Sequence, residues 1–327
     1  MTTDIFAEWL QRQGLSIVKT PSSSWCRVRS RVYQAFPYSW VIEPSEEEIE
    51  DILRKHRVVA LRYSTSLENQ VGRISYHVIS DDPSYSLDSL PKKARYDVLH
   101  GLEYVSCEAI SMRSLAQDGW ELRCQTLVRQ GRPHAETQKI WERICLSAEG
   151  LTGFEAWGAI RNGELVAALL SCSSGDTVSI LYQQSKTQHL RFAVNNALVY
   201  TFTREVFQRP GIRRIFYGLH SLDAPAGVDD FKFRMGYTAK PVRQRVVFNP
   251  FIRPLVNNLS LDLLKRSLNM LPTRTMMEKV VGVFQFYLQG NRPLFEQEWP
   301  KALLNQKDAI LAKVAGPRCP TGMMVED

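Results

Sequence analysis

The sequence lacks several patterns that would assign it directly to a protein class. It has no Cys-x-x-Cys pair, and its six cysteines are widely separated, which excludes zinc-ribbon and thioredoxin-type sites. It has no apolar run of about 18 residues, so no segment is expected to span a bilayer. It also has no run of roughly five like charges, which argues against a basic arm that follows a nucleic-acid backbone.

The opening segment MTTDIFAEWL contains Asp4 and Glu8 and has no basic stretch before an apolar core. It therefore does not resemble a signal peptide. We expect a cytoplasmic protein whose cysteines are buried and reduced, because intracellular compartments keep thiols in that state. No metal site is expected.

The composition is that of a folded globular protein. Apolar residues make up 44% of the 327 positions, and 14 Phe, 12 Tyr and 7 Trp supply enough apolar area for cores, which excludes global disorder. At roughly 150 residues per domain, the length allows two domains and an appendage. Lysine and arginine total 41 against 34 acidic residues, a net charge of +7 that favours anionic partners.

Strands and helices alternate within residues 1–132, which we take as an N-terminal domain. Apolar and basic residues alternate within 25–42, as is typical of a strand with one solvent-facing side. Ser45 and Glu48 form a capping box at the start of a helix that ends near His56. Further expected elements are strands at 58–63, 74–79 and 104–110 and helices from about 90, at 120–129 and at 135–148.

A second domain is predicted over residues 133–250. Asn162-Gly163 between two apolar runs indicates a hairpin, and a turn at 173–176 extends it to a three-stranded antiparallel meander. A polar loop at 183–189, a helix at 190–207, a strand at 213–217, a short helix at 227–236 and a strand at 238–248 follow. Residues 251–327 form a helical extension, and its regularly spaced leucines predict docking against the second domain.

The order of elements after Phe154 resembles the GNAT fold of acyl-CoA-dependent N-acyltransferases. The resemblance implies an α+β fold with mixed, mainly antiparallel sheets flanked by helices. It also implies that acyl-CoA is the donor, held by the loop after the third strand and by the helix that follows. The family's glycines are absent from this loop, so side chains would replace backbone donors. The implied donor-binding residues are Gln184, Ser185, Lys186, Thr187, His189, Arg191 and Asn195.

Phe231-Lys232 followed by Gly236-Tyr237 resembles the Fem-type peptidyltransferases and the BioF2-like acetyltransferases, which contain two GNAT-like domains in tandem. The resemblance spans residues 25–250 and implies that Phe231 and Lys232 belong to the catalytic site. An ammonium beside a reacting carbonyl stabilises the oxyanion that forms as an amine attacks. In the alternative interpretation, Lys232 is an exposed lysine on a short helix.

Position in this fold implies further site residues. His220 and Asp223 follow a strand at the place where substrate is expected, and either could take a proton from the amine. The basic helix near residue 92 could hold an anionic group, and the strand at 58–63 would line the acceptor groove. The alternative for each is a solvated surface position. The implied substrate-binding residues are Arg62, Tyr63, Lys92, Lys93 and Arg95.

The sequence thus predicts an N-acyltransferase that moves an acyl group from a thioester donor, acyl-CoA, to an amine. The acceptor would be a small molecule or a cell-envelope or polysaccharide precursor. Two alternatives stay open: the donor is aminoacyl-tRNA, as the glycine-poor loop allows, or the fold is a non-catalytic binding module. In the last case the basic tail, with Arg253, Lys265 and Arg266, would contact an acidic membrane or a partner.

Overall fold

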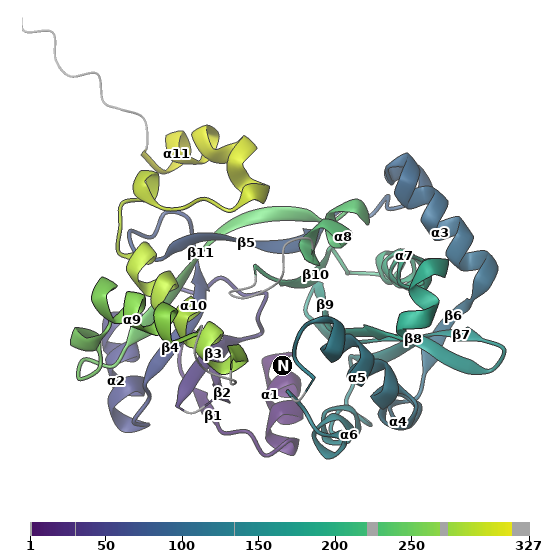
Figure 1. Ribbon diagram of the computed structural model, residues 1–327, viewed down its shortest axis with the longest axis horizontal. Helices are drawn as coiled ribbons and strands as arrows, with labels where there is room; N and C mark the ends of the chain where they lie inside the picture. The colour runs from purple at the N-terminus through teal and green to yellow at the C-terminus, as the bar shows by residue number, and fades with distance from the viewer. Residues whose placement is uncertain (1, 30, 134, 221–227, 269–273, 316–327) are drawn as a thin grey trace, which may run out of the picture.

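One mixed sheet of eleven strands runs through the molecule in the order β1-β2-β3-β4-β11-β5-β10-β9-β8-β7-β6 (Figure 1). The computed structural model describes residues 2–29, 31–133, 135–220, 228–268 and 274–315. The strands are β1 (Ile17–Lys19), β2 (Ser24–Arg29), β3 (Val32–Phe36), β4 (Ala60–Thr65), β5 (Arg73–Ser80), β6 (Ser106–Ile110), β7 (Phe154–Arg161), β8 (Glu164–Ser174), β9 (Thr177–Ser185), β10 (Arg214–Leu219) and β11 (Thr238–Phe248).

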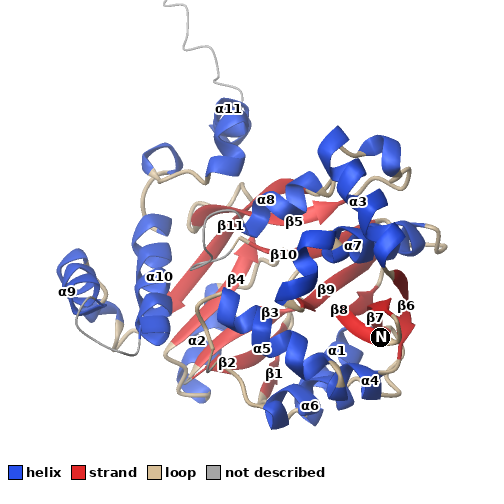
Figure 2. Ribbon diagram, turned by 45° about the vertical axis from the view of Figure 1, so that its right-hand side comes forward, coloured by secondary structure: helices blue, strands red, loops and turns tan. Residues whose placement is uncertain are grey.

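Helices cover both faces of this sheet (Figure 2). The α-helices are α1 (Thr2–Arg12), α2 (Glu46–Lys55), α3 (Lys92–Tyr104), α4 (Met112–Gln117), α5 (Gly119–Arg129), α6 (Gln138–Leu146), α7 (Val194–Phe207), α8 (Val228–Arg234), α9 (Asn258–Leu268), α10 (Arg274–Gly290) and α11 (Lys307–Ala315). Short 3-10 helices are η1 (Leu87–Ser89), η2 (Thr187–Phe192), η3 (Arg253–Leu255), η4 (Leu294–Glu296) and η5 (Lys301–Gln306).

The two halves of the sheet repeat one strand pattern. In the first half, β1, β2 and β3 pair antiparallel and β3 then pairs parallel with β4. In the second half, β7, β8 and β9 pair antiparallel and β9 then pairs parallel with β10. The antiparallel pair β11 and β5 joins the halves, with β11 against β4 and β5 against β10. The predicted α+β fold with tandem, mainly antiparallel halves and C-terminal helices is therefore confirmed.

Strand pairing also connects the predicted domains. β11 belongs to the predicted second domain but lies between β4 and β5 of the first. The boundaries at 132 and 250 stay predictions.

Helix α1, which is not among the predicted elements, packs in the core of the second half. Its Phe6 and Trp9 contact Phe154, and Trp9 Nε1 donates to the carbonyl of Ile144 at 2.9 Å.

Helices α3 and α7 pack closely on one face of the second half. A Cβ on Gly101 of α3 would lie 2.7 Å from the backbone oxygen of Ala193, at the start of α7. Only glycine permits this approach without a shift of one helix. The close contact fixes the start of α7 beside the end of β9, where the candidate site lies.

Local signals in the sequence are confirmed at several points. The hydroxyl of Ser45 accepts from the backbone N–H of Glu48 at 3.1 Å, so the predicted N-cap is confirmed. The Glu48 carboxylate accepts from the N–H and hydroxyl of Ser22, so the second bond of a capping box does not form. Asn162 and Gly163, with φ of 51° and 79°, form the turn between β7 and β8, which is the geometry that a two-residue hairpin requires.

The predicted loop at 183–189 is wrong in its first part. β9 continues to Ser185, because Gln184 and Ser185 pair with Ala168 and Ala167 of β8. The backbone of any residue can pair with a long neighbouring strand such as β8. The polar side chains at the end of β9 therefore did not end the strand. The following α-helix begins at Val194 rather than at Leu190, after the 3-10 turn η2.

The C-terminal helices pack against the central strands, but part of α9 is exposed. Phe286 of α10 lies in a core cluster with Val246 and Phe248 of β11. Leu259 and Leu263 are 77% and 63% exposed, so the prediction that the leucines of this segment dock against the second domain is wrong for these two. No helix within the described ranges has both the length and the apolar composition to cross a membrane.

Candidate active site

β9 and β10 separate after a short parallel ladder, and a cavity lies in the gap. Their pairing ends at Ser179 and Phe216. Bulges where β10 pairs with β5 and where β9 pairs with β8 bend the two strands, which helps them to diverge. The gap holds a cavity of about 290 Å³ lined by residues of α5, β9, α7, β10 and α8. We call it the wedge cavity.

The equivalent gap in the first half is closed by the chain itself. Beyond the parallel pairing of β3 and β4, Val41 forms a bridge to Ser64. The backbone N–H of Ile42 donates to the carbonyl of Ser64 at 2.9 Å. The divergence in the second half is therefore the one that offers space for a ligand.

Lys232 presents its ammonium at the wedge cavity. The side chain is 14% exposed, and Nζ donates to Oδ1 of Asp229 at 2.8 Å and lies 5.1 Å from the ring centroid of Tyr217. Tyr76 Oη donates to the other carboxylate oxygen of Asp229 at 2.8 Å. A Cβ on Gly218, whose φ is 143°, would lie 3.6 Å from Nζ. An ammonium carries three protons, so this arrangement orients Nζ and still allows it to donate to a ligand.

Several buried polar atoms of cavity-lining residues lack a hydrogen-bond partner. They are both amide atoms of Gln184, Oδ1 of Asn195 and the hydroxyl of Tyr217. Gln184 is 1% exposed, and burial raises the pKa of Tyr217 well above its usual value. A buried polar group without a partner costs about 1–3 kcal/mol. The set indicates a cavity built for a ligand that supplies hydrogen-bonding groups.

Helix α5, which precedes the predicted boundary at 132, forms one wall of the wedge cavity. The guanidinium of Arg129 donates to Thr187 Oγ1 at 2.7 Å, to Thr126 Oγ1 at 2.9 Å and to Ser185 Oγ at 3.1 Å. Burial lowers the pKa of Arg129. Asn195 Nδ2 also donates to Ser185 Oγ, at 3.1 Å. This network holds the end of β9 between α5 and α7.

The loop predicted to bind the donor is engaged mainly with protein groups. Lys186 Nζ lies 2.6 Å from carboxylate oxygens of both Glu121 and Glu164. Burial by itself would lower the pKa of Lys186, but hydrogen bonds to these carboxylates raise it above its usual value. The backbone N–H of Thr187 donates to Gln125 Oε1 at 2.6 Å. These two groups would have to leave their partners to bind a pyrophosphate.

The remaining residues of the predicted donor set divide between the cavity and its surroundings. Gln184, Ser185 and Asn195 line the wedge cavity, whereas Lys186, Thr187, His189 and Arg191 do not. His189 is buried, with Nδ1 3.1 Å from Tyr104 Oη. Arg191 is exposed, and its guanidinium lies 4.6 Å from the ring centroid of Phe192.

His220 follows β10 and is connected to Lys232 through the side chains of Tyr76 and Asp229. Its ring stacks on Tyr76 with centroids 4.5 Å apart, and Tyr76 donates to Asp229. Burial, with a smaller contribution from the charge of Arg73, lowers the pKa of His220 to about 4, so the ring is neutral at pH 7. Asp223, the other predicted base, lies outside the described residues.

None of the five predicted substrate-binding residues, two on β4 and three on α3, lines the wedge cavity. Arg62 Nε donates to Gln244 Oε1 at 3.1 Å, and Tyr63 accepts from Arg245 at 2.9 Å. Burial raises the pKa of Tyr63. Lys92, Lys93 and Arg95 lie on α3 instead, where Lys93 pairs with Asp97 at 2.6 Å and Arg95 with Asp88 at 3.2 Å.

Four residues of the site are absent from the sequence prediction: Tyr76, Arg129, Tyr217 and Asp229. Asp229 is three residues before Lys232, a spacing that places the two side chains together on a helix. Tyr217 stands next to the glycine at the bulge in β10. Tyr76 lies on β5 and Arg129 on α5, far from Lys232 in the sequence, and no local pattern connects them to the cavity.

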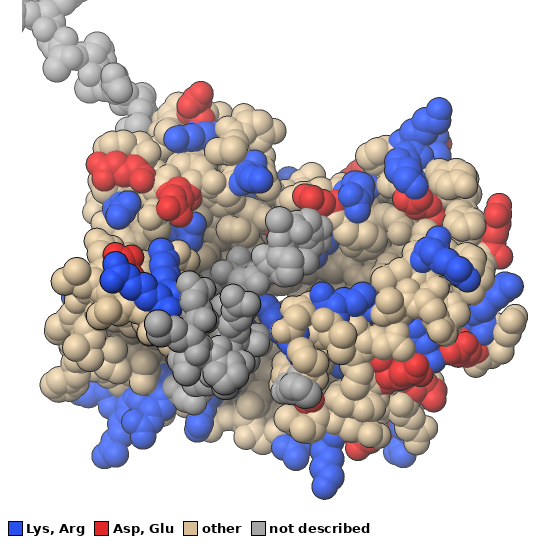
Figure 3. Space-filling view, viewed as in Figure 1, with Lys and Arg blue, Asp and Glu red and all other residues tan. Residues whose placement is uncertain are grey.

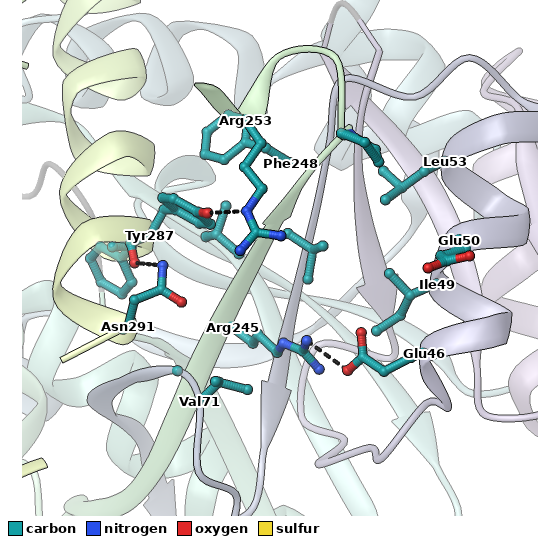
Figure 4. A pocket seen from close by; sticks show the side chains of 16 residues that line it. Glu46, Ile49, Glu50, Leu53, Val71, Arg245, Phe248, Arg253, Tyr287 and Asn291 are labelled. Carbon is teal, nitrogen blue, oxygen red and sulfur yellow. Dashed lines mark hydrogen bonds and ion pairs between the residues drawn. The ribbon is translucent and has the colours of Figure 1, made fainter. Parts of the chain in front are cut away.

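A second cavity, of about 230 Å³, lies between α2, β11 and α10 (Figure 4). Its charged groups are paired with protein partners. Arg245 lies 2.7 Å from a carboxylate oxygen of Glu46, and Arg253 Nε donates to Tyr287 Oη at 3.0 Å. Among its described lining residues no buried side-chain polar atom lacks a partner. The wedge cavity is therefore the better candidate for an active site.

No protein-family model and no curated protein sequence matches this chain. Its structure is similar to FemX, with a TM-score of 0.52 over 77% of this chain and 93% of that one. It is also similar to L-PGS from Bacillus licheniformis, with a TM-score of 0.52 over 84% and 91% of the two chains. A third similar structure, with a TM-score of 0.51 over 82% and 94%, is the C-terminal domain of a protein assigned as a lysylphosphatidylglycerol synthetase, from Agrobacterium fabrum.

Each of these structures is 11% identical to this chain in sequence. At that identity the likeness concerns the fold alone. The chain has a GNAT-like, Fem-type fold, which confirms the resemblance drawn from the sequence at the level of architecture.

Proposed function

We propose that the wedge cavity is the active site of an acyltransferase that moves an activated acyl group to an amine. One observation carries the proposal: Lys232 lines the same cavity as Gln184, Asn195 and Tyr217, the residues with unpartnered buried polar atoms. The likeness of the fold to FemX and to a lysylphosphatidylglycerol synthetase supports a transferase of acyl or aminoacyl groups.

In the proposed step, the amine nitrogen attacks the carbonyl carbon of the donor and a C–N bond forms. The carbonyl oxygen becomes an oxyanion, to which Lys232 Nζ donates a hydrogen bond. The C–S bond of a thioester, or the C–O bond of an ester, then breaks. The proton lost by the amine goes to the leaving sulfur or oxygen. Asp229 holds Nζ in place through this step, since it accepts one of the three ammonium protons.

Acyl-CoA is the donor that the resemblance implies, and the acceptor would be an amine on a small molecule or on a cell-envelope or polysaccharide precursor. A specific observation favours aminoacyl-tRNA as a second candidate donor. Lys186 and the N–H of Thr187, which would hold the pyrophosphate of coenzyme A, already bind Glu121, Glu164 and Gln125.

Calorimetric titration with acetyl-CoA, and in parallel with an aminoacyl-tRNA mixture, separates the two donors. Lys232→Met keeps the length of the side chain and removes its charge. With whichever donor binds, this variant should turn over at least tenfold more slowly than the wild type. Lys240→Met is the matched control, because Lys240 also forms an ion pair, with Asp81 at 2.9 Å, but does not line the cavity. Equal turnover in the two folded variants would remove Lys232 from the mechanism. Binding of neither donor would favour a non-catalytic module.

A further inference from the structure

Four apolar side chains, which we call the stripe, are exposed between the turn before η3 and the middle of α9. The four residues recur every four positions, a spacing that places Leu259 and Leu263 on one face of α9. Clustered exposed apolar side chains mark interaction surfaces, whereas single ones do not. The members and their exposed fractions are Phe251 (91%), Leu255 (65%), Leu259 (77%) and Leu263 (63%).

The opposite side of this segment is anchored to the protein. Val256 and Leu261 are 5% and 8% exposed, and Val256 belongs to the core cluster that contains Phe248 and Phe286. The stripe therefore faces outward because the inward positions are already filled.

Basic side chains surround the stripe. Lys265 and Arg266 are exposed in the last turn of α9, and Asp262, in the middle of the helix, is exposed too. In Figure 3 the surface over α9, at the left edge, is largely uncharged, and Lys and Arg side chains gather beside it and below it, over α2.

Hydrogen bonds place the start of the stripe next to the basic end of α2. Asn249 Nδ2 donates to the carbonyls of Leu53 and Val58, at 3.3 and 3.0 Å. Between these two positions lies the exposed run Arg54-Lys55-His56-Arg57. Arg54 and Lys55 form exposed ion pairs within α2, which solvent screens. The stripe thus carries cationic groups at both of its ends.

We propose that this surface, the exposed stripe with its basic rim, docks the protein on an anionic lipid bilayer. The exposed apolar side chains of the stripe can enter the boundary between headgroups and acyl chains, while the neighbouring Lys and Arg contact lipid phosphates. A protein partner would need a pocket for each of these apolar side chains, whereas a bilayer needs no such pockets. The docking does not depend on the proposed transferase activity.

Sedimentation of the full-length protein with vesicles tests the proposal. Vesicles of phosphatidylcholine with about one third phosphatidylglycerol should bind the protein. Vesicles of phosphatidylcholine alone should bind it at least tenfold more weakly. Added salt should weaken the binding to the anionic vesicles. The double variant Leu259→Ser/Leu263→Ser should lower the partition coefficient at least tenfold, since each leucine contributes about a factor of ten on burial. Lys265→Glu/Arg266→Glu should have a comparable effect.

Phe295→Ser is the matched control, because Phe295 is 64% exposed but lies on η4, outside the stripe. It should bind vesicles as the wild type does. All variants alter exposed side chains, so their unfolding midpoints should equal that of the wild type. Absence of binding to anionic vesicles, or wild-type binding by Leu259→Ser/Leu263→Ser, would overturn the proposal. A dimer that this double variant abolishes would overturn it too, by assigning the stripe to a second copy of the chain.

Discussion

Replacing Gln184 by methionine should stabilise the free protein, although it removes a polar side chain from the centre of the candidate site. Both amide atoms of Gln184 are buried without a partner. Each such atom costs about 1–3 kcal/mol, but a cavity of about 290 Å³ admits water, which recovers much of this cost. Methionine has a similar shape and no amide, so the unfolding free energy should rise by about 1–2 kcal/mol.

The same substitution at Gln297 provides a control with the opposite sign. Gln297 is 4% exposed, accepts from the backbone N–H of Ile74 at 2.7 Å, and donates to the carbonyls of Gly72 and Arg292. Gln297→Met leaves the N–H of Ile74 and the carbonyl of Arg292 without this partner, whereas the carbonyl of Gly72 still accepts from Arg243. The substitution should lower the unfolding free energy by about 2–4 kcal/mol.

Urea unfolding followed by circular dichroism measures both changes. A ligand of the wedge cavity should stabilise the wild type and have little effect on Gln184→Met, because the amide that receives it is absent. If Gln184→Met destabilised the protein as much as Gln297→Met, the amide of Gln184 would have structural partners, and the argument that it awaits a ligand would fail.

Three further predictions concern the site and its support. Lys232→Met should lower both turnover and stability, because it leaves the Asp229 carboxylate without its cation. Adding Asp229→Asn should restore the stability but not the turnover. Recovery of turnover in the double variant would contradict the oxyanion role. His77 and His220 are held neutral with pKa values of about 4, against 6.5 ordinarily, so the unfolded state gains protons first as pH falls. Stability should therefore drop between about pH 6.5 and 4 by roughly 3 kcal/mol per histidine, and His77→Gln should flatten the pH dependence of the urea midpoint; an unchanged slope would show that the ring is protonated in the fold. Gly101→Ala should lower stability by about 1–3 kcal/mol, because its methyl meets a backbone oxygen of α7 at 2.7 Å; a wild-type melting temperature would contradict this contact.

Much of the local structure was readable from the sequence because its causes are local. The helix N-cap at Ser45 and the hairpin at Asn162-Gly163 depend on residues within a few positions of each other, and both are present. Lys232 was singled out from its place in the order of elements, and in the structure it lines the wedge cavity. Its role in catalysis stays a proposal.

The composition of the site depended on contacts that no local pattern records. Arg129 and Tyr76 reach it because α5 packs on β9 and because β5 pairs with β10. Lys186 had the charge expected of a phosphate ligand, but two carboxylates 22 and 65 positions away hold it. Which partner a charged side chain finds is decided by all elements packed around it, and the sequence near Lys186 contains only some of them.

The sequence by itself determined where many of the strands and helices lie, because hydrophobic periodicity, caps and turns act over short distances. It did not determine helix α1 or the end of β9. The tertiary structure decided that β11 inserts between β4 and β5, that one of two equivalent strand gaps stays open, and that Leu259 and Leu263 face outward. The physical reason is that several segments compete to cover each strand edge, gap or apolar face. Which segment covers it, or whether it stays open, depends on how the whole chain packs.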